Sequence, residues 1–173
     1  MMTRDDVLQL FTHMEWADAA IWNAVNSTPA QRDRTVMERL HHIHVVQHIY
    51  LKMWLGSPEP GRELADFADL SEIQNWARAN YAALATYIGD IDPSTLASPV
   101  AFPWAGELVK WFGEARPATV QETIIQVAMH TAHHRGQLCT LIRQLGGEPP
   151  LVDFVGWLWM GKPEPQWQTL PTA

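Results

Sequence analysis

Four long stretches of the chain carry apolar residues at alternating steps of three and four, which is the pattern of amphipathic α-helices. The spacing predicts helices over residues 3–26, 35–55, 71–91 and 119–146. The stripe of the last helix consists of Ile124, Val127, Thr131, His134, Leu138, Leu141 and Leu145. Four helices with one apolar face each predict an all-α protein built as a four-helix bundle.

The expected ends of these helices carry start and stop signals. Thr3 can cap the first helix. Ser71 with Gln74 and Thr119 with Glu122 form capping-box patterns at the third and fourth helices. A glycine followed by a proline two residues later ends the second helix after residue 55.

Smaller elements are expected between and after the long helices. The stretch VAFPWAGELVKWF predicts a small hairpin before the fourth helix, with its turn at Ala105 and Gly106. Trp104, Trp111 and Phe112 would then cover one end of the bundle. After two prolines, LVDFVGWLWMG predicts a short extra C-terminal helix, and a Pro-containing tail begins at about residue 162.

Composition narrows the class of protein. A length of 173 residues fits a single domain over residues 1–173, and 47% apolar residues describe an ordinary globular chain. The net charge of −7, without a Lys- or Arg-rich face, excludes a nucleic-acid-binding surface. The single Cys139 cannot form an internal disulfide and fits a reducing compartment. Neither a membrane-length apolar run nor a secretory signal pattern is visible, so we expect a cytoplasmic protein without membrane contact.

The last helix contains the candidate chemistry. His130 and His134 lie four residues apart, so their imidazoles project from one helix face about one turn apart. His134 occupies an apolar-stripe position, where a buried imidazole needs partners for its nitrogens. Two such imidazoles can hold one metal ion, although an H-x-x-x-H pair also arises by chance. The zinc-protease motif is excluded because Thr131 stands where that motif needs glutamate, and His133 points away from the pair.

A third ligand could come from the second helix, which contains four of the eight histidines. His41 and His48 lie nearly opposite its apolar stripe, so we expect both to be solvated. His42 and His44 lie on the flanks of the stripe, and periodicity does not separate them. His13 in the first helix is expected to be a partly exposed helix residue.

Three segments of the chain match one family pattern. The segment HTAHHRGQ begins at His130 and continues as LIRQLGGEPPLVDF, and LHHIHVVQHIYLKMWLG lies upstream. Together they resemble the HxxxHRGQ, LRxxGxxPPxxDF and LxHIxxxxxxWLxxxxG-like segments of the DinB-like (DinB/YfiT-like) metalloenzyme family. In this chain Tyr50 stands where the family usually has tryptophan, and Gln126 where many relatives have another histidine.

The resemblance implies a fold and a site. It implies an up-down-down-up four-helix bundle in which His42, His130 and His134 bind one divalent metal ion, so it favours His42 over His44. Three imidazoles leave coordination positions open, as in catalytic rather than structural sites. Zinc or nickel is expected first, with iron, copper or manganese as alternatives.

The resemblance also implies a class of activity and a partner. Relatives include transferases and isomerases that use a low-molecular-weight thiol, so the expected partner is a small-molecule substrate of this kind. A metal-dependent hydrolase and a non-catalytic metal-binding or stress-response protein remain the alternatives. Relatives often pair through bundle helices, and nine tryptophans are many for one small core, so we expect a homodimer.

Three further residues lie in or near these segments: Arg135 and Asp153 each allow more than one role, and Cys139 is excluded as a ligand. Arg135 either orients the site or meets an anionic substrate group, or it forms a surface salt bridge. Asp153 either fixes an imidazole tautomer or caps the short C-terminal helix. Cys139 is not a candidate ligand, because five residues after His134 it faces well away around the helix.

Overall fold

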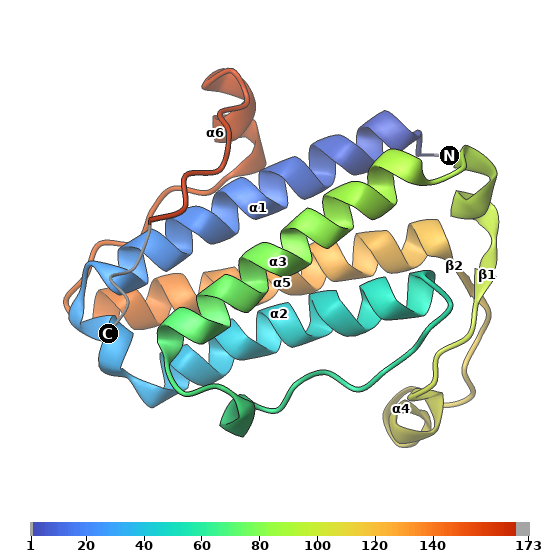
Figure 1. Ribbon diagram of the computed structural model, residues 1–173, viewed down its shortest axis with the longest axis horizontal. Coiled ribbons are helices and arrows are strands. Elements are labelled where there is room, and N and C mark those ends of the chain that lie inside the picture. Colours follow the sequence, from blue (N-terminus) through green and yellow to red (C-terminus); the bar gives the residue numbers. More distant parts are fainter. Residues whose placement is uncertain (1, 169–173) are drawn as a thin grey trace.

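The computed structural model describes residues 2–168 and consists mainly of four long helices (Figure 1). They are α1 (Arg4–Asn26), α2 (Arg34–Trp54), α3 (Leu70–Asp90) and α5 (Val120–Gln144). Helices α1 and α2 each pack against α3 and α5. In Figure 1, α1 and α5 run in one direction and α2 and α3 in the other. The predicted all-α, up-down-down-up bundle is therefore confirmed.

Capping side chains fix where the long helices begin. Capping boxes form between Thr3 and Asp6 at α1 and between Thr119 and Glu122 at α5, as their sequence patterns predict. At α3 the predicted box of Ser71 and Gln74 is wrong. Asp69 caps this helix instead and accepts a hydrogen bond from the Glu72 backbone amide at 3.0 Å. An aspartate is at least as good an N-cap as serine, so the helix begins at the earlier signal.

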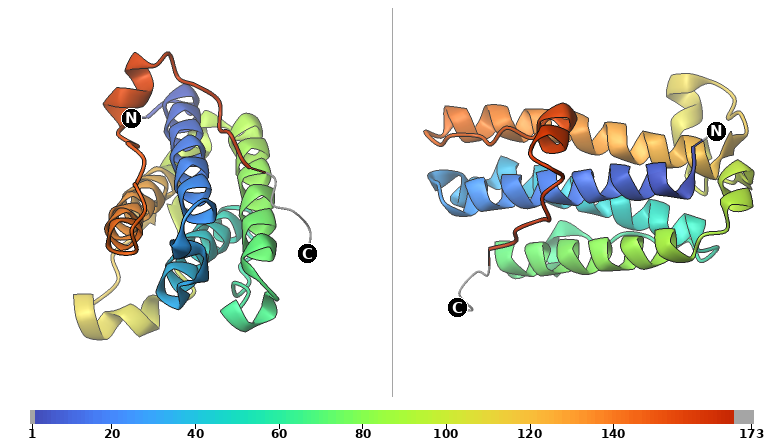
Figure 2. Two further views of the ribbon diagram at one scale, coloured as in Figure 1. Left: turned by 90° about the vertical axis from the view of Figure 1, so that its left-hand side faces the viewer. Right: turned by 90° about the horizontal axis from the view of Figure 1, so that it is seen from above.

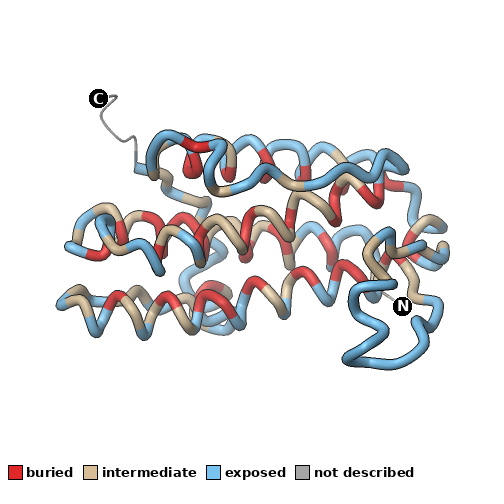
Figure 3. The backbone as a smooth tube through the Cα atoms, turned by 90° about the horizontal axis from the view of Figure 1, so that it is seen from below, coloured by how far each residue is buried: buried red, intermediate tan, exposed pale blue. Residues whose placement is uncertain are grey.

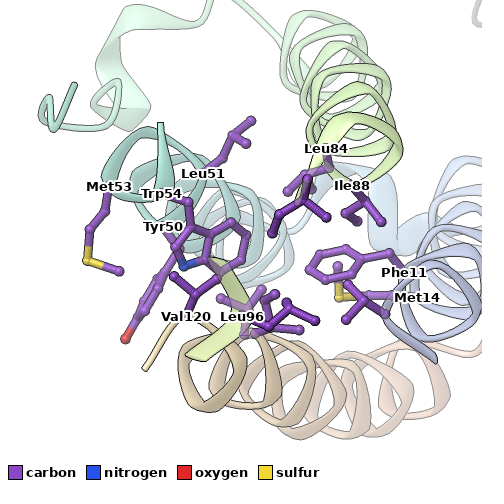
Figure 4. Close-up of a cluster of buried hydrophobic side chains, with 14 of the residues drawn as sticks. Phe11, Met14, Tyr50, Leu51, Met53, Trp54, Leu84, Ile88, Leu96 and Val120 are labelled. Atoms are coloured by element: carbon purple, nitrogen blue, oxygen red, sulfur yellow. The ribbon is translucent and has the colours of Figure 1, made fainter. Parts of the chain in front are cut away.

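The bundle core has two apolar halves. Figure 3 shows the buried residues on the inward faces of the long helices. Phe11, Trp54, Leu84 and Val120 belong to the cluster at one end, drawn in Figure 4. The other end is filled by residues such as Leu40, Ile73 and Leu138, and the fully buried Trp22 packs among them. Polar side chains are buried between these two clusters along the helices.

The segment before α5 differs in part from its prediction. Two antiparallel strands are present, β1 (Pro99–Val100) and β2 (Ala118–Thr119), but they lie far apart in the sequence. The expected turn at Ala105 and Gly106 is wrong, because both residues begin the helix α4 (Ala105–Phe112). Its sequence AGELVKWF places an acidic residue in the first turn and a lysine in the last, which favours a helix over a strand.

Helix α4 covers the bundle end less than expected. Trp104, just before it, packs against Tyr50 and Phe102 as predicted for a covering residue. Trp111 and Phe112 are 73% and 82% exposed, so the prediction that they cover the bundle is wrong. Figure 1 shows α4 set apart from the four long helices, and none of its residues is buried.

The C-terminal segment lies across the bundle. The predicted short helix is α6 (Phe154–Trp159), and its Trp157 is fully buried against α1. The following chain crosses from α1 to α3 (Figure 2). The Trp167 indole donates to Glu15 of α1 at 3.0 Å and packs against Tyr81 of α3. The predicted Pro-containing tail is described up to residue 168, and its last five residues lie outside the described part.

Short 3₁₀ helices occupy the connections: η1 (Pro29–Arg32), η2 (Leu64–Asp66) and η3 (Pro93–Ala97). Residues 55–69 form the long connection between the parallel helices α2 and α3, and this stretch passes along the outside of α2 (Figure 1). None of the helices in residues 2–168 is long and apolar enough to cross a membrane.

Candidate metal centre

Three histidines from two packed helices meet at one point. His42 comes from α2, and His130 and His134 lie one turn apart on α5. The Nε2 atom of His130 lies 3.2 Å from that of His42 and 3.1 Å from that of His134. These three residues are the only group of three or more His, Cys, Asp or Glu in residues 2–168 whose ligand atoms converge in this way. We call this group the three-histidine site.

The converging nitrogens fit one divalent ion. A tetrahedral zinc ion with nitrogen ligands at about 2.0–2.1 Å would separate those nitrogens by about 3.3 Å, close to the two spacings observed. Hydrogen bonds among three imidazoles could satisfy only some of these Nε2 atoms, since a neutral ring has one N–H. The donor set therefore fits a bound cation better than a self-contained hydrogen-bonded cluster.

The electrostatic surroundings keep these imidazoles neutral. Burial, together with the neighbouring His134 and His42, lowers the pKa of His130 to about 4. Burial also lowers the pKa of His42, with further contributions from His134 and Arg39. The pKa of His134 is lowered by burial and partly restored by its bond to Gln137. Neutral imidazoles at pH 7 have lone pairs available for a metal ion.

The ring of His134 is oriented by a chain of hydrogen bonds. Its Nδ1 lies 2.9 Å from the Gln137 side-chain oxygen, and the Gln137 amide nitrogen lies 2.9 Å from Nε2 of His133. In this arrangement the amide donates to His133, so its oxygen accepts the proton on Nδ1 of His134. The proton is thereby held on Nδ1, and Nε2 of His134 presents its lone pair to the site.

The site opens onto a large surface cleft. The cleft has a volume of about 890 Å³, and His42 and His130 form part of its wall. Tyr50, Trp104 and Leu108 contribute an apolar side toward α4, while the connection after α2 contributes Arg62 and charged neighbours. Since no fourth His, Cys, Asp or Glu among residues 2–168 joins the three histidines, the arrangement leaves room for small molecules beside an ion.

A second cluster of polar side chains lies in the core behind the site. All four long helices contribute to this polar layer, which consists of Asp18, His44, Gln47, Tyr81, Thr131 and Arg135. Arg135 donates to Asp18 at 2.9 Å, and the Tyr81 hydroxyl donates to the other carboxylate oxygen. The Gln47 amide nitrogen lies 3.0–3.3 Å from Asp18, Tyr81 and Thr131. In α5, Thr131 and Arg135 of this layer directly follow His130 and His134 of the three-histidine site.

The polar layer changes the interpretation of Arg135. Its side chain is 6% exposed and its charge is paired with Asp18, so the expected surface salt bridge is wrong. It is also committed inside the core and not available to an anionic substrate group. Arg135 instead holds α5 against α1 directly beside His134.

The structure distinguishes His42 from His44. Trp22 donates its indole N–H to Nε2 of His44 at 2.9 Å, so Nδ1 carries the proton and donates to Gln47 at 2.9 Å. Both nitrogens of His44 are therefore occupied, and the ring is fully buried. His44 is a core residue, while His42 joins the three-histidine site.

Two histidines of α2 outside the site are more covered than their positions predicted. His48 contacts Asn80 of α3 and Glu59, and its side chain is only 14% exposed. The ring of His41 packs against Phe67 and Trp76. Because the connection between α2 and α3 passes over this outer face of α2, the prediction of solvation is wrong for His48. His41 is half-buried and still lines the cleft, so it is only partly covered.

His13 was expected to be partly exposed but is 6% exposed. The segment around α6 covers it: His13 donates from Nε2 to the Val152 carbonyl at 3.0 Å and packs against Phe154 and Trp157. Burial lowers its pKa, and the hydrogen bond to Val152 opposes this shift. Its role is to attach the C-terminal segment to α1.

The remaining candidates have no place in the site. Asp153 is the N-cap residue of α6, as one of its two interpretations predicts, although its exposed side chain makes no capping hydrogen bond. It makes no hydrogen bond to an imidazole, so the predicted role in fixing a tautomer is wrong. Cys139 is half-buried and outside the converging group, as expected, and burial raises the pKa of its thiol. Gln126 is exposed on the wall of the cleft.

Two residues beside the site were missed by sequence reasoning. Gln137, which orients His134, is three residues after it and so on the same helix face. Arg39 lies three residues before His42 on α2 and lowers the pKa of both His42 and His134. In both cases the i, i+3 spacing to a candidate ligand was the available signal.

Comparison with known proteins agrees with the geometry. No curated protein matches the sequence. Among protein families, residues 1–168 match the model described as DinB family. This match covers nearly the whole chain, including the four long helices and all three converging histidines. The chain therefore belongs to the DinB family.

Proposed function

We propose that this protein is a metal-dependent enzyme that uses its three-histidine site to transfer a low-molecular-weight thiol to an electrophile. The observation that carries the proposal is the opening of His42 and His130 onto a cleft of about 890 Å³. A closed structural site would require a fourth ligand, and residues 2–168 place none beside the three histidines. Zinc or nickel is the ion we expect first, because neutral imidazoles suit both.

The reacting nucleophile has to come from outside the chain. Cys139 is the only cysteine, it lies away from the three converging nitrogens, and burial raises the pKa of its thiol. When bound, a divalent ion would lower the pKa of an external thiol and supply a thiolate at neutral pH. A water molecule could use the same open position, so hydrolysis is the competing reaction.

The residues of this chain would then bind and orient. His42, His130 and His134 remain neutral at pH 7 because their pKa values are lowered, so they act as ligands and not as proton donors. Gln137 holds the proton of His134 on Nδ1. The apolar wall formed by Tyr50, Trp104 and Leu108 offers a surface for the electrophile and reduces its contact with water.

Metal binding is the first test. His42→Ala, His130→Ala and His134→Ala should each lower the metal content of the purified protein sharply, measured by elemental analysis. The matched controls are His41→Ala and His48→Ala, which alter histidines of the same helix outside the converging group. Full metal content in His42→Ala, with a folded circular dichroism spectrum, would refute the proposed ligand set.

Catalysis is the second test. Metal-loaded protein is mixed with a generic electrophile and one of bacillithiol, mycothiol, glutathione or cysteine, and conjugation is followed against the uncatalysed rate. Conjugation should require metal, survive Cys139→Ala and disappear in His134→Ala. If every thiol reacts at the uncatalysed rate while an ester substrate is hydrolysed, the hydrolase replaces the transferase. If neither reaction occurs, the non-catalytic metal-binding function is favoured.

A further inference from the structure

Arg39 provides a permanent positive charge beside the three-histidine site. The neighbours that shift the pKa values of the three ligands are Arg39, whose charge is permanent, and other histidines. No aspartate or glutamate appears among these neighbours. Glu59, Glu63 and Glu107 lie on the wall of the cleft but are outside the group that acts on the three-histidine site. A divalent ion held there would add two further positive charges, which favours an anionic occupant.

Arg39 is the fixed charge in this group. It lies one helical turn before His42 on α2, so the two side chains share a face of the helix. Its Nε atom is buried and has no hydrogen-bond partner, and it forms no ion pair within residues 2–168. An arginine presents five N–H donors, and leaving a buried one unpaired is unfavourable unless a ligand satisfies it.

The other arginines near the site are committed elsewhere. Arg135 is paired with Asp18 in the core at 2.9 Å. Arg62, on the far wall of the cleft, donates to the Asp66 carbonyl at 2.7 Å and stacks on the Phe67 ring. The first arginine of α2, Arg34, pairs with Glu38. Arg39 is thus the arginine that combines proximity to the histidines with a buried, unpaired Nε donor.

We propose that Arg39 binds a carboxylate of the molecule that occupies the three-histidine site, so that the substrate class is a thiol or related ligand with a carboxylate a short chain away from its reacting atom. Arginine matches a carboxylate with two parallel N–H donors, which gives orientation as well as affinity. That the ligand carries a thiol rests on the proposed function. That it also carries a carboxylate rests on the position of Arg39 on α2.

The test compares three small thiols that differ in the charge of one end. Zinc-loaded protein is titrated by calorimetry with 3-mercaptopropionate, 2-mercaptoethanol and cysteamine, whose ends are anionic, neutral and cationic. We expect 3-mercaptopropionate to bind roughly tenfold more tightly than 2-mercaptoethanol, which corresponds to about 1.4 kcal/mol. Cysteamine should bind most weakly. In Arg39→Gln this preference should disappear, and Arg39→Lys should restore part of it.

Controls separate binding from folding and from metal loss. Arg34→Gln removes another arginine of α2, one that is exposed and paired with Glu38, and it should keep the full preference. Zinc content and the melting temperature of Arg39→Gln should match the unaltered protein, since Arg39 is neither a ligand nor part of either apolar cluster.

Each outcome bears on one part of the inference. If the thiols bind but Arg39→Gln keeps the preference for the anion, the carboxylate site is refuted and the thiol function stands. If no thiol binds, propionate and propionamide are titrated instead. A preference for propionate that depends on Arg39 would then support the carboxylate site while the thiol function fails. If propionate and propionamide bind alike, the carboxylate site is refuted as well.

Discussion

Replacing Arg135 by methionine should destabilise this protein more than any exposed charge substitution. Arg135 and Asp18 are 6% and 3% exposed, and their charged atoms are 2.9 Å apart in the core. Methionine has a similar reach and fills much of the same space, but it leaves the Asp18 carboxylate buried without its positive partner. The change therefore isolates the loss of the charge from the loss of packing.

The expected cost can be worked from the contacts that remain. Breaking a buried ion pair by removing one partner costs about 3–5 kcal/mol. Tyr81 and Gln47 still donate to Asp18 in the variant, so the lower end applies, about 3 kcal/mol. For a chain of this size each kcal/mol lowers the melting temperature by about 2–4 °C, which gives a decrease of about 6–12 °C.

The assay is urea unfolding followed by circular dichroism, with Arg34→Met as the matched control. Arg34 pairs with Glu38 on the surface of α2, so its loss should cost no more than about 0.5 kcal/mol. In an Asp18→Asn background the cost of Arg135→Met should shrink, because no buried charge is left behind. A loss below about 1 kcal/mol in the single variant, or an equal loss in both backgrounds, would show that the ion pair does not stabilise the core as argued.

Three further predictions concern the site and the assembly. The pKa of His130 is lowered to about 4 in the folded protein, so as the pH falls the imidazole of His130 becomes protonated in the unfolded chain before it does in the folded one. The free energy of unfolding of the apoprotein should therefore fall as the pH is lowered from about 6.5 toward 4. It should fall more steeply than that of His130→Gln, and a constant difference in unfolding free energy between the two proteins over this window would contradict the prediction. Gln137→Leu should weaken metal affinity about 10–100-fold in competition with a chelator, whereas His133→Ala should have a smaller effect. Light scattering should give a dimer of the 19.6 kDa chain, and a monomer at micromolar concentration would refute it.

The long helices and the two candidate ligands of α5 were predictable because local spacing determines them. The apolar stripe through Ile124, Val127 and Leu138 fixes which face of α5 enters the core. His134 occupies that stripe and His130 follows by the i, i+4 relation, so their proximity needs no knowledge of other segments. For the same reason the capping box at Thr119 could be placed to the residue.

Residues covered by distant segments were not predictable. His48 and His41 lie opposite the apolar stripe of α2, which predicts exposure, but the connection over residues 55–69 and helix α3 cover them. His13 is buried because a segment about 140 residues later crosses α1. The spacing of apolar residues predicts which face of a helix enters the core, but it does not predict which distant segments pack on the other faces. Periodicity alone left His42 and His44 open, and only the family resemblance favoured His42; the physical reason, the indole of Trp22 that occupies His44, lies on another helix.

The polar layer explains why an expensive set of buried groups lies in the middle of this bundle. Two apolar clusters alone would allow the helices to rotate or slide at moderate cost, because apolar contacts are not directional. The contacts of Asp18, Gln47 and Arg135 form only at one rotation and one height of α1, α2, α3 and α5. Thr131 and Arg135 each follow a candidate ligand directly in α5, so the same constraint fixes where His130 and His134 point. Removing Arg135 should therefore weaken metal binding as well as folding, although the arginine does not contact the converging nitrogens.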